Sequence, residues 1–248
     1  MKMKLTVLGC YGPYPAAGGA CSGYLLEAGD CRLLIDCGNG VLSRLQRHLK
    51  PWELEAVLLS HLHFDHCADL LVLRYALDHA RARDLRRRPL PLHAPPEPSA
   101  ELKRLLYKDL FDIKPLSPGE PLTLGPFNFS FIETLHSLPC LAMRIETEDG
   151  LFVYSGDTEY FDGLAEFAAG ADLFLCEANL LEGEGGGIPA NHLTAAAAAR
   201  LAAAAGVKRL LLTHFHPERS QALSLKEARV HFAAVERVRE GETYLITP

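Results

Sequence analysis

The chain has 248 residues and a formal net charge of −6 with histidine neutral; 48% of its residues are hydrophobic and 23% are charged. These values are typical of a soluble globular protein with one large domain or two small ones. No apolar run approaches the length of a membrane span, and the net charge gives no overall attraction to nucleic acids.

The cysteines and the N-terminus indicate a cytoplasmic protein. Seven cysteines are scattered along the sequence without a C-x-x-C pair, which is typical of a reducing compartment and offers no thiolate zinc site. The N-terminal segment MKMKLTVLGC resembles a lipoprotein signal, but its apolar run is shorter than the roughly 7–15 residues of a signal-peptide core. We interpret it as the first strand.

Strand-like and helix-like patterns alternate along the chain. Short apolar runs predict strands at Leu5–Leu8, Tyr24–Glu27, Arg32–Ile35, Ala56–Leu59, Phe127–Ile132, Ala142–Glu146, Leu151–Tyr154, Leu173–Cys176 and Leu210–Thr213. Helical patterns occupy Gly40–Leu49, Ala68–Arg83, Ala100–Leu110, Asp162–Ala168 and Leu225–Arg239. This order predicts an α/β fold with two β-rich halves and helices on their outer faces. No linker separates the halves, so we expect a single domain over residues 1–248.

Three stretches have a biased composition. The alanine-rich tract from Thr194 to Gly206 predicts a helix, with Thr194 as its N-cap and Gly206 at its C-terminal end. The proline-rich stretch Leu92–Ser99 predicts a loop. An arginine cluster predicts a solvated helix end, with a phosphate-facing patch beside the active site as the alternative. Its members are Arg74, Arg81, Arg83, Arg86, Arg87 and Arg88.

Four potential metal ligands are concentrated in HLHFDH, directly after the predicted strand Ala56–Leu59. His61 and His63 are two positions apart, so on an extended backbone they point to the same side. Asp65 and His66 follow where the chain turns and can face a second point nearby. One metal ion could take all four side chains, but two ions fit the spacing better.

Three further candidates come directly after predicted strands, namely His136, Asp157 and His214. Converging strand ends are where α/β architectures place functional sites. Together with H-x-H-x-D-H, these residues resemble the pattern of the metallo-β-lactamase superfamily. The resemblance extends from LLIDCGNG, which contains Asp36, to THFHP. It implies an αββα sandwich, in which two mixed β-sheets are flanked by helices and the metal ions lie at one edge.

The resemblance also implies a ligand set. His61, His63 and His136 would bind one ion, Asp65, His66 and His214 would bind the other, and Asp157 would bridge them. Zinc is the expected metal, with manganese or iron as alternatives, because imidazole and carboxylate groups bind all three. Two divalent ions ~3.5–4 Å apart acidify a shared water and polarise the scissile bond. The implied reaction is therefore hydrolysis by a metal-bridged hydroxide.

The segment Asn191-His192-Leu193-Thr194 resembles ribonuclease Z-like and related phosphodiesterase members of the superfamily. In these proteins a histidine precedes a small-residue helix, and a glutamate orients it; His192 and Glu177 match them. His192 would act as the general acid, so the implied catalytic residues are Asp65, Glu177 and His192. The alternatives are a capping role for His192 and a surface position for Glu177.

The spacing of His136 and Asp157 limits the substrate. True ribonuclease Z enzymes insert an arm that grips transfer RNA between these positions, but here only 21 positions separate them. We therefore expect a small or cyclic phosphodiester as substrate, with nucleic acid less favoured and no membrane partner. A glyoxalase II-like thioester hydrolase, ribonuclease Z-type RNA processing and a metal-retaining binding protein without turnover remain alternatives. A homodimer through the region Arg74–Leu110 also remains open.

Overall fold

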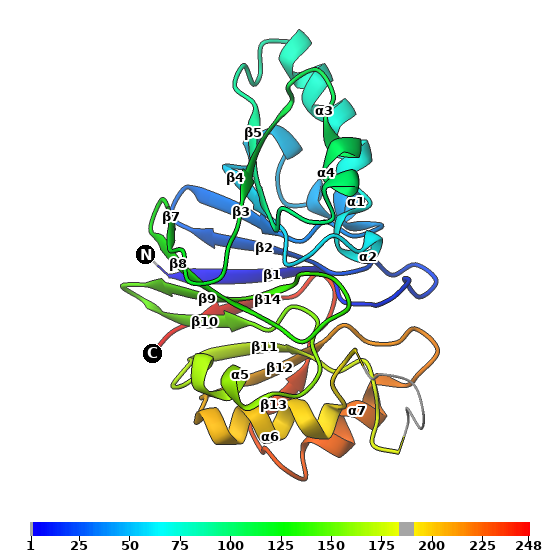
Figure 1. Cartoon of the computed structure of the whole chain (residues 1–248), viewed down its shortest axis with the longest axis vertical. Coiled ribbons are helices and arrows are strands. Elements are labelled where there is room, and N and C mark those ends of the chain that lie inside the picture. The colour runs from blue at the N-terminus through cyan, green and yellow to red at the C-terminus, as the bar shows by residue number, and fades with distance from the viewer. Residues whose placement is uncertain (1, 184–190) are drawn as a thin grey trace.

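Two β-sheets lie face to face in the middle of the molecule, with helices on their outer sides (Figure 1). The computed structural model describes residues 2–183 and 191–248. The predicted αββα sandwich is confirmed. The first sheet has the strand order β14 (Thr243–Ile246), β1 (Met3–Gly9), β2 (Gly23–Ala28), β3 (Cys31–Ile35), β4 (Ala56–Leu58), β5 (Leu90–Ala94), β6 (Phe111–Pro115). The second has the order β13 (Val235–Arg237), β12 (Leu210–Thr213), β11 (Leu173–Glu177), β10 (Gly150–Tyr154), β9 (Leu141–Thr147), β8 (Phe127–Glu133), β7 (Leu122–Leu124).

Both sheets are mixed in the same way. In the first sheet, β14 to β3 pair antiparallel and β3 to β6 pair parallel. In the second sheet, β7 to β10 pair antiparallel and β10 to β13 pair parallel. The carboxyl ends of neighbouring parallel strands lie at the same edge of a sheet, which is where α/β folds place ligand sites. The segments that follow β4, β10 and β12 therefore come together.

The helices form two outer layers (Figure 1). On the side of the first sheet lie α1 (Val41–Leu45), η1 (Pro51–Glu53), α2 (Phe64–Cys67), α3 (Leu70–Ala82) and α4 (Ser99–Leu105). On the side of the second sheet lie α5 (Asp162–Phe167), α6 (Ala195–Ala205) and α7 (Gln221–Ala228). Over residues 2–183 and 191–248, no helix has the length and apolar character needed to cross a membrane.

The main core lies between the two sheets. Strand β8, with the sequence FNFSFIE, alternates between buried and exposed residues, and Phe127, Phe129 and Phe131 point inward. They belong to one apolar cluster with inward-facing residues of the first sheet, such as Leu5 and Leu26. A second cluster joins the outer face of the first sheet to α1 and α3. The first cluster also includes Leu201 of α6, so each sheet is packed on both faces.

Helix α6 confirms the interpretation of the alanine-rich tract. The Thr194 side chain accepts a hydrogen bond from the backbone N–H of Ala197 at 3.1 Å, as an N-cap does. Gly206 ends the helix at φ +61°, a left-handed conformation that glycine adopts at little cost. The small side chains allow α6 to contact β11 and β12.

Two predicted elements are wrong in part. The predicted loop Leu92–Ser99 begins inside β5, so its first residues form a short buried strand. This strand tolerates Pro91 because Pro91 pairs only with β6, at Asp112. The predicted helix Leu225–Arg239 is shifted, since α7 spans Gln221–Ala228 and β13 follows at Val235–Arg237. Pairing of Val235 with Leu210 of β12 overrides the local helical pattern there.

Candidate metal centre

The segment after β4 places four predicted ligands at two neighbouring points. His63 has extended backbone angles, φ −65° and ψ 149°, and helix α2 begins at the next residue. Asp65 and His66 lie in that single turn of helix, so they face a different point from His61 and His63. Figure 1 shows α2 at one edge of the sandwich. The two-point arrangement that the spacing predicts is present.

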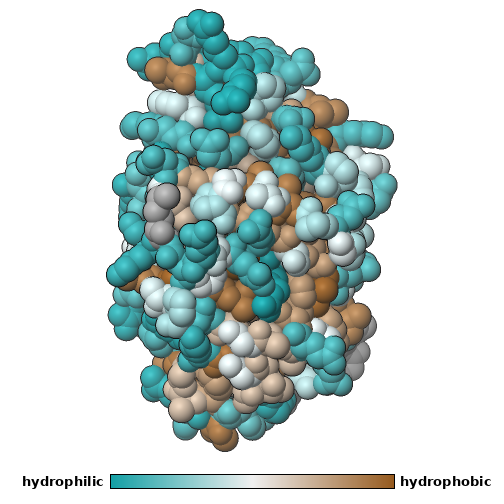
Figure 2. Space-filling model, turned by 90° about the vertical axis from the view of Figure 1, so that its left-hand side faces the viewer, coloured by the Kyte–Doolittle hydropathy of each residue, from teal (hydrophilic) through white to brown (hydrophobic). Residues whose placement is uncertain are grey.

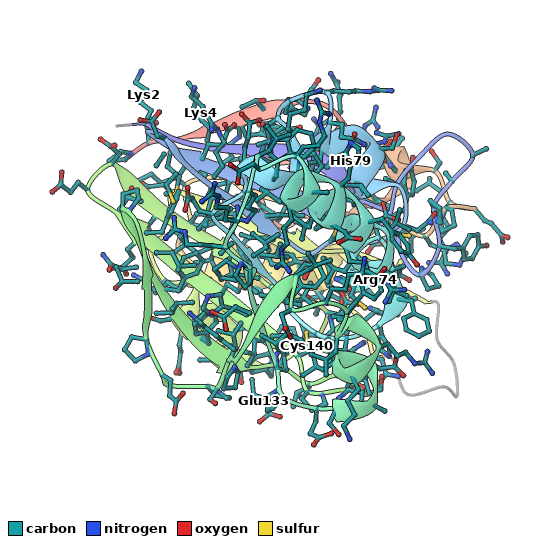
Figure 3. All side chains as sticks on the ribbon, turned by 90° about the horizontal axis from the view of Figure 1, so that it is seen from above. Lys2, Lys4, Arg74, His79, Glu133 and Cys140 are labelled. Atoms are coloured by element: carbon teal, nitrogen blue, oxygen red, sulfur yellow. The ribbon has the colours of Figure 1, made fainter. Side chains whose placement is uncertain are left out.

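The loop between Glu133 and Cys140, both labelled in Figure 3, brings His136 from the second sheet. Its base is closed by a hydrogen bond from the Thr134 backbone N–H to the Cys140 carbonyl oxygen at 2.9 Å. The Thr134 hydroxyl donates to the Asp157 carbonyl oxygen at 2.7 Å. The loop is thus tied to the turn after β10.

His61, His63 and His136 form the first group. Nε2 of His61 and Nε2 of His136 each lie 3.0 Å from Nδ1 of His63. Burial lowers the pKa of all three imidazoles, and the neighbouring histidines lower it further. Neutral imidazole is the form that binds a metal ion.

Asp65, His66, Asp157 and His214 form the second group. His214 Nε2 lies 3.2 Å from Asp65 Oδ2 and 3.3 Å from Asp157 Oδ2. His66 Nε2 also lies 3.3 Å from Asp157 Oδ2. The same Asp157 oxygen is 3.6 Å from Nε2 of His61 in the first group. Asp157 therefore stands between the two groups, in the position that the resemblance assigns to a bridging ligand.

The chemistry of these groups fits divalent cations. Asp157 Oδ1 is buried and lacks a hydrogen-bond partner among the described residues. Unpaired buried polar atoms are costly, and a bound cation satisfies them. Although burial opposes it, the charges of Asp157 and the neighbouring carboxylates hold the pKa of His66 well above its usual value, so the group attracts positive charge. Imidazole and carboxylate together suit zinc, manganese or iron.

Asp36 was not predicted as a site residue, although an aspartate directly after the apolar strand β3 is a recognisable signal. Its fully buried carboxylate accepts hydrogen bonds from the Ser60 backbone N–H at 2.8 Å and from the Tyr154 hydroxyl at 2.8 Å. His66 Nδ1 lies 2.8 Å from Asp36 Oδ2. A carboxylate on the far ring nitrogen fixes the tautomer and orientation of a ligating histidine. Asp36 thereby turns Nε2 of His66 toward Asp157.

Asn179 was also missed, and it braces His214. Its side-chain amide donates to the His214 carbonyl oxygen at 3.0 Å and to the Gly12 carbonyl oxygen at 2.9 Å. His214 has φ +56°, a left-handed conformation that is uncommon outside glycine. A side chain at Gly12 would overlap the His214 imidazole. The glycine at position 12 and the amide at position 179 therefore set the position of this ring.

His192 and Glu177 are brought together beside the second group. His192 Nδ1 lies 3.0 Å from Glu177 Oε1, and its ring stacks on His214 with centroids 5.1 Å apart. Glu177 is fully buried, so it is not a surface residue, and it also accepts a hydrogen bond from the Thr158 backbone N–H at 2.7 Å. The helix cap is Thr194, so His192 is not the capping residue.

The protonation of His192 follows from this pairing. Burial lowers the pKa of the imidazole, but the charge and hydrogen bond of Glu177, together with the charges of Asp157 and Asp65, outweigh burial and raise the pKa to about 9. The pairing with Glu177 therefore favours the imidazolium form of His192. A protonated imidazole held over the candidate metal centre can give its proton to a departing oxygen.

Three of the six arginines in the cluster donate to backbone carbonyl oxygens of other segments. Arg86 donates to the carbonyl oxygens of Trp52 and Leu54. Arg81 donates to those of Lys108 and Asp109, in the loop before β6. Arg74 stacks on Tyr75 and contacts the Arg104 carbonyl oxygen. The end of α3 forms the tip of the molecule, which is hydrophilic in Figure 2. This agrees with the predicted solvated helix end.

Residues 31–215 match the family described as the beta-lactamase superfamily domain. The probable metallo-hydrolase YhfI from Bacillus subtilis (strain 168) is 40% identical over 212 residues, which cover 86% of each chain. The crystal structure of the metallo-beta-lactamase fold protein YhfI matches with a TM-score of 0.95 and 36% identity over 99% of this chain and 100% of that one.

One further relative is a ribonuclease Z, and a solved tRNase Z shares the fold. Ribonuclease Z from Mycolicibacterium gilvum (strain PYR-GCK) is 31% identical over 250 residues, which cover 87% of this chain and 85% of that protein. The short form of human tRNase Z has the same fold, with a TM-score of 0.79 and 20% identity over 99% of this chain and 100% of that one. The chain therefore belongs to the metallo-β-lactamase superfamily, among its ribonuclease Z-like metallo-hydrolases.

Proposed function

We propose that the protein is a two-metal phosphodiesterase that hydrolyses a small or cyclic phosphodiester. The family is one of metal-dependent hydrolases, which sets the reaction type. The observation that carries the finer proposal is the ion pair between His192 and Glu177, at 3.0 Å, beside the candidate metal centre. A phosphodiester has a poor leaving group, an alkoxide, that needs a proton.

The residues divide into ligands and a proton donor. His61, His63 and His136 would hold one ion, Asp65, His66 and His214 would hold the other, and Asp157 would be shared between them. Zinc, manganese or iron bound there would supply an acidified water and polarise a phosphoryl oxygen. His192 supplies the proton to the leaving oxygen, and Glu177 keeps His192 charged and oriented.

Ribonuclease Z-type RNA processing is the second candidate, because a relative of that name is 31% identical over 87% of this chain. The segment between His136 and Asp157 weighs against it. This segment forms only the hairpin of β9 and β10, in which Gly150 pairs with Thr147. It has no room for an inserted arm that grips transfer RNA. We therefore favour small substrates over RNA.

A substrate comparison tests the reaction class. Bis(p-nitrophenyl) phosphate and a thioester substrate of similar size are assayed before and after chelation with EDTA, and after zinc is restored. We expect metal-dependent hydrolysis of the phosphodiester to exceed that of the thioester. Faster thioester hydrolysis would support the glyoxalase II-like alternative, and no turnover of either substrate at full metal occupancy would contradict the enzyme assignment.

A leaving-group comparison tests the proton donor. His192→Ala should keep both ions and lose about 10²–10⁴-fold in turnover of an alkyl phosphodiester, the usual range for general acid–base catalysis. The loss should be smaller for a nitrophenyl ester, whose leaving group scarcely needs a proton. His79→Ala is the matched control, since His79 is an exposed histidine on α3 (Figure 3). Equal losses for both esters, or loss of an ion, would show that His192 is not the proton donor.

A further inference from the structure

Two buried tyrosines from opposite sheets meet beneath the candidate metal centre. Tyr24 lies in β2 of the first sheet, and Tyr154 is the last residue of β10 in the second sheet. Their side chains are 0% and 1% exposed, and the ring centroids are 5.2 Å apart with an edge-to-face angle of 61°. The proposed catalytic scheme uses neither hydroxyl.

Each tyrosine hydroxyl reaches across to the opposite sheet. Tyr154, from the second sheet, donates to Asp36 Oδ2 at 2.8 Å, and Asp36 follows β3 of the first sheet. Tyr24, from the first sheet, forms a 2.7 Å hydrogen bond with the hydroxyl of Thr213, the last residue of β12 in the second sheet. The two hydrogen bonds therefore cross between the sheets in opposite directions.

Both hydrogen bonds between the sheets end beside residues of the second ligand group. Asp36 holds Nδ1 of His66 at 2.8 Å, and Thr213 directly precedes His214. Asp36 and His214 both have φ +56°, a left-handed backbone that a non-glycine residue keeps only where its surroundings enforce it. His66 and His214 belong to the second ligand group.

The first ligand group depends much less on this pair of tyrosines. His136 Nδ1 lies 2.9 Å from the Asn191 carbonyl oxygen, and several hydrogen bonds separate it from either tyrosine hydroxyl. His61 is reached only through Ser60, whose backbone N–H and hydroxyl donate to Asp36, whereas His66 contacts Asp36 directly. The two groups should therefore respond differently when a tyrosine hydroxyl is removed.

We propose that Tyr24 and Tyr154 are positioning residues that selectively set the second ligand group, by tying Asp36 and Thr213 across the two sheets. This inference rests on the proposed two-metal function. Direct partners of metal ligands typically contribute 10–100-fold to metal affinity, and the tyrosines act one contact further out, so we expect about 10-fold from each. Tyr24→Phe and Tyr154→Phe keep the packed rings and remove only the crossing hydrogen bonds.

The test is a zinc titration by chelator competition, which resolves two binding steps, together with the absorption spectrum of the cobalt-substituted protein. Each tyrosine variant should weaken one step by about 10-fold or more, leave the other within about 3-fold, and alter the cobalt spectrum. Thr213→Val removes the same bond as Tyr24→Phe and should match it, whereas Thr213→Ser retains a hydroxyl and should bind as the wild type does.

Tyr244→Phe is the matched control. The Tyr244 hydroxyl accepts from the Arg239 backbone N–H at 3.1 Å and donates to Glu242 at 3.0 Å, and neither partner is a candidate ligand. It should leave both binding steps unchanged. If the wild type binds two ions and Tyr24→Phe and Tyr154→Phe bind them equally well, or weaken both steps alike, the inference is overturned and the proposed function stands. If the wild type binds fewer than two ions, the proposed function itself fails.

Discussion

Replacement of Glu177 by glutamine tests how the protein keeps His192 protonated. The substitution removes the negative charge 3.0 Å from His192 Nδ1 and keeps the size of the side chain. One oxygen still accepts the hydrogen bond that the Thr158 backbone N–H donates at 2.7 Å. The other oxygen, which accepts a hydrogen bond from the Leu193 N–H at 3.2 Å, is replaced by an NH2 group that cannot accept it. The variant should therefore lose about 1–3 kcal/mol of stability.

The size of the effect on His192 follows from its pKa. The value of about 9 exceeds the ordinary value of 6.5 by an amount equivalent to about 3 kcal/mol at ~1.36 kcal/mol per unit. Burial alone lowers the pKa, and the side chain is only 23% exposed, so solvent screens the Glu177 charge weakly. Without that charge, the pKa of His192 should fall, because Glu177 is the largest of the groups that raise it.

The assay is the pH dependence of kcat/KM for an alkyl phosphodiester at fixed metal occupancy. A general acid must be protonated, so activity falls as pH rises through its pKa, and Glu177→Gln should move this basic limb to lower pH by about 1 unit or more. Bound cations lower the pKa in both proteins, so the difference between the two profiles is the measured quantity. A variant that binds two ions, remains folded and shows an unmoved basic limb would refute the reasoning.

The remaining predictions concern metal content, packing, pH and RNA. Elemental analysis should find close to two divalent ions per chain, and Asp157→Ala should lose at least one; a single ion in the wild type would contradict the bridged site. Gly12→Ala should displace the His214 ring, weaken binding of one ion and lower stability by about 1–3 kcal/mol. An unchanged zinc titration would show that the position of the ring does not depend on Gly12. In metal-free protein the raised pKa of His192 stabilises the folded state fully below pH 6.5, and this stabilisation is lost as pH rises through about 9. The wild type should therefore exceed His192→Gln in unfolding free energy by less at pH 10 than at pH 6, as measured by urea unfolding. Precursor transfer RNA should be cleaved less efficiently than small phosphodiesters, and efficient cleavage at the 3′ side of the transfer RNA body would overturn the choice of substrate.

The clustering of the candidate ligands could be predicted from the sequence because it depends on local patterns. Each candidate follows a strand that is visible as an apolar run, and the spacing of His61, His63, Asp65 and His66 separates two directions on its own. The division of these residues between two ions rests on the family resemblance. The alanine-rich helix was predictable for the same reason, since its cap, its residues and its terminal glycine are neighbours in sequence. Local propensity failed where pairing decided the outcome, as in β13, whose residues form an edge strand against β12.

The supports behind the ligands were decided only by the tertiary structure. Tyr154 and Asp36 are 118 positions apart, and Asn179 lies 167 positions from Gly12, so no short-range pattern connects either pair. The burial of Glu177 likewise depends on β11 being enclosed between β10, β12 and the chain around His192. A buried carboxylate or amide takes its role from the donors and acceptors that packing brings within about 3 Å, and packing joins residues regardless of their separation along the chain.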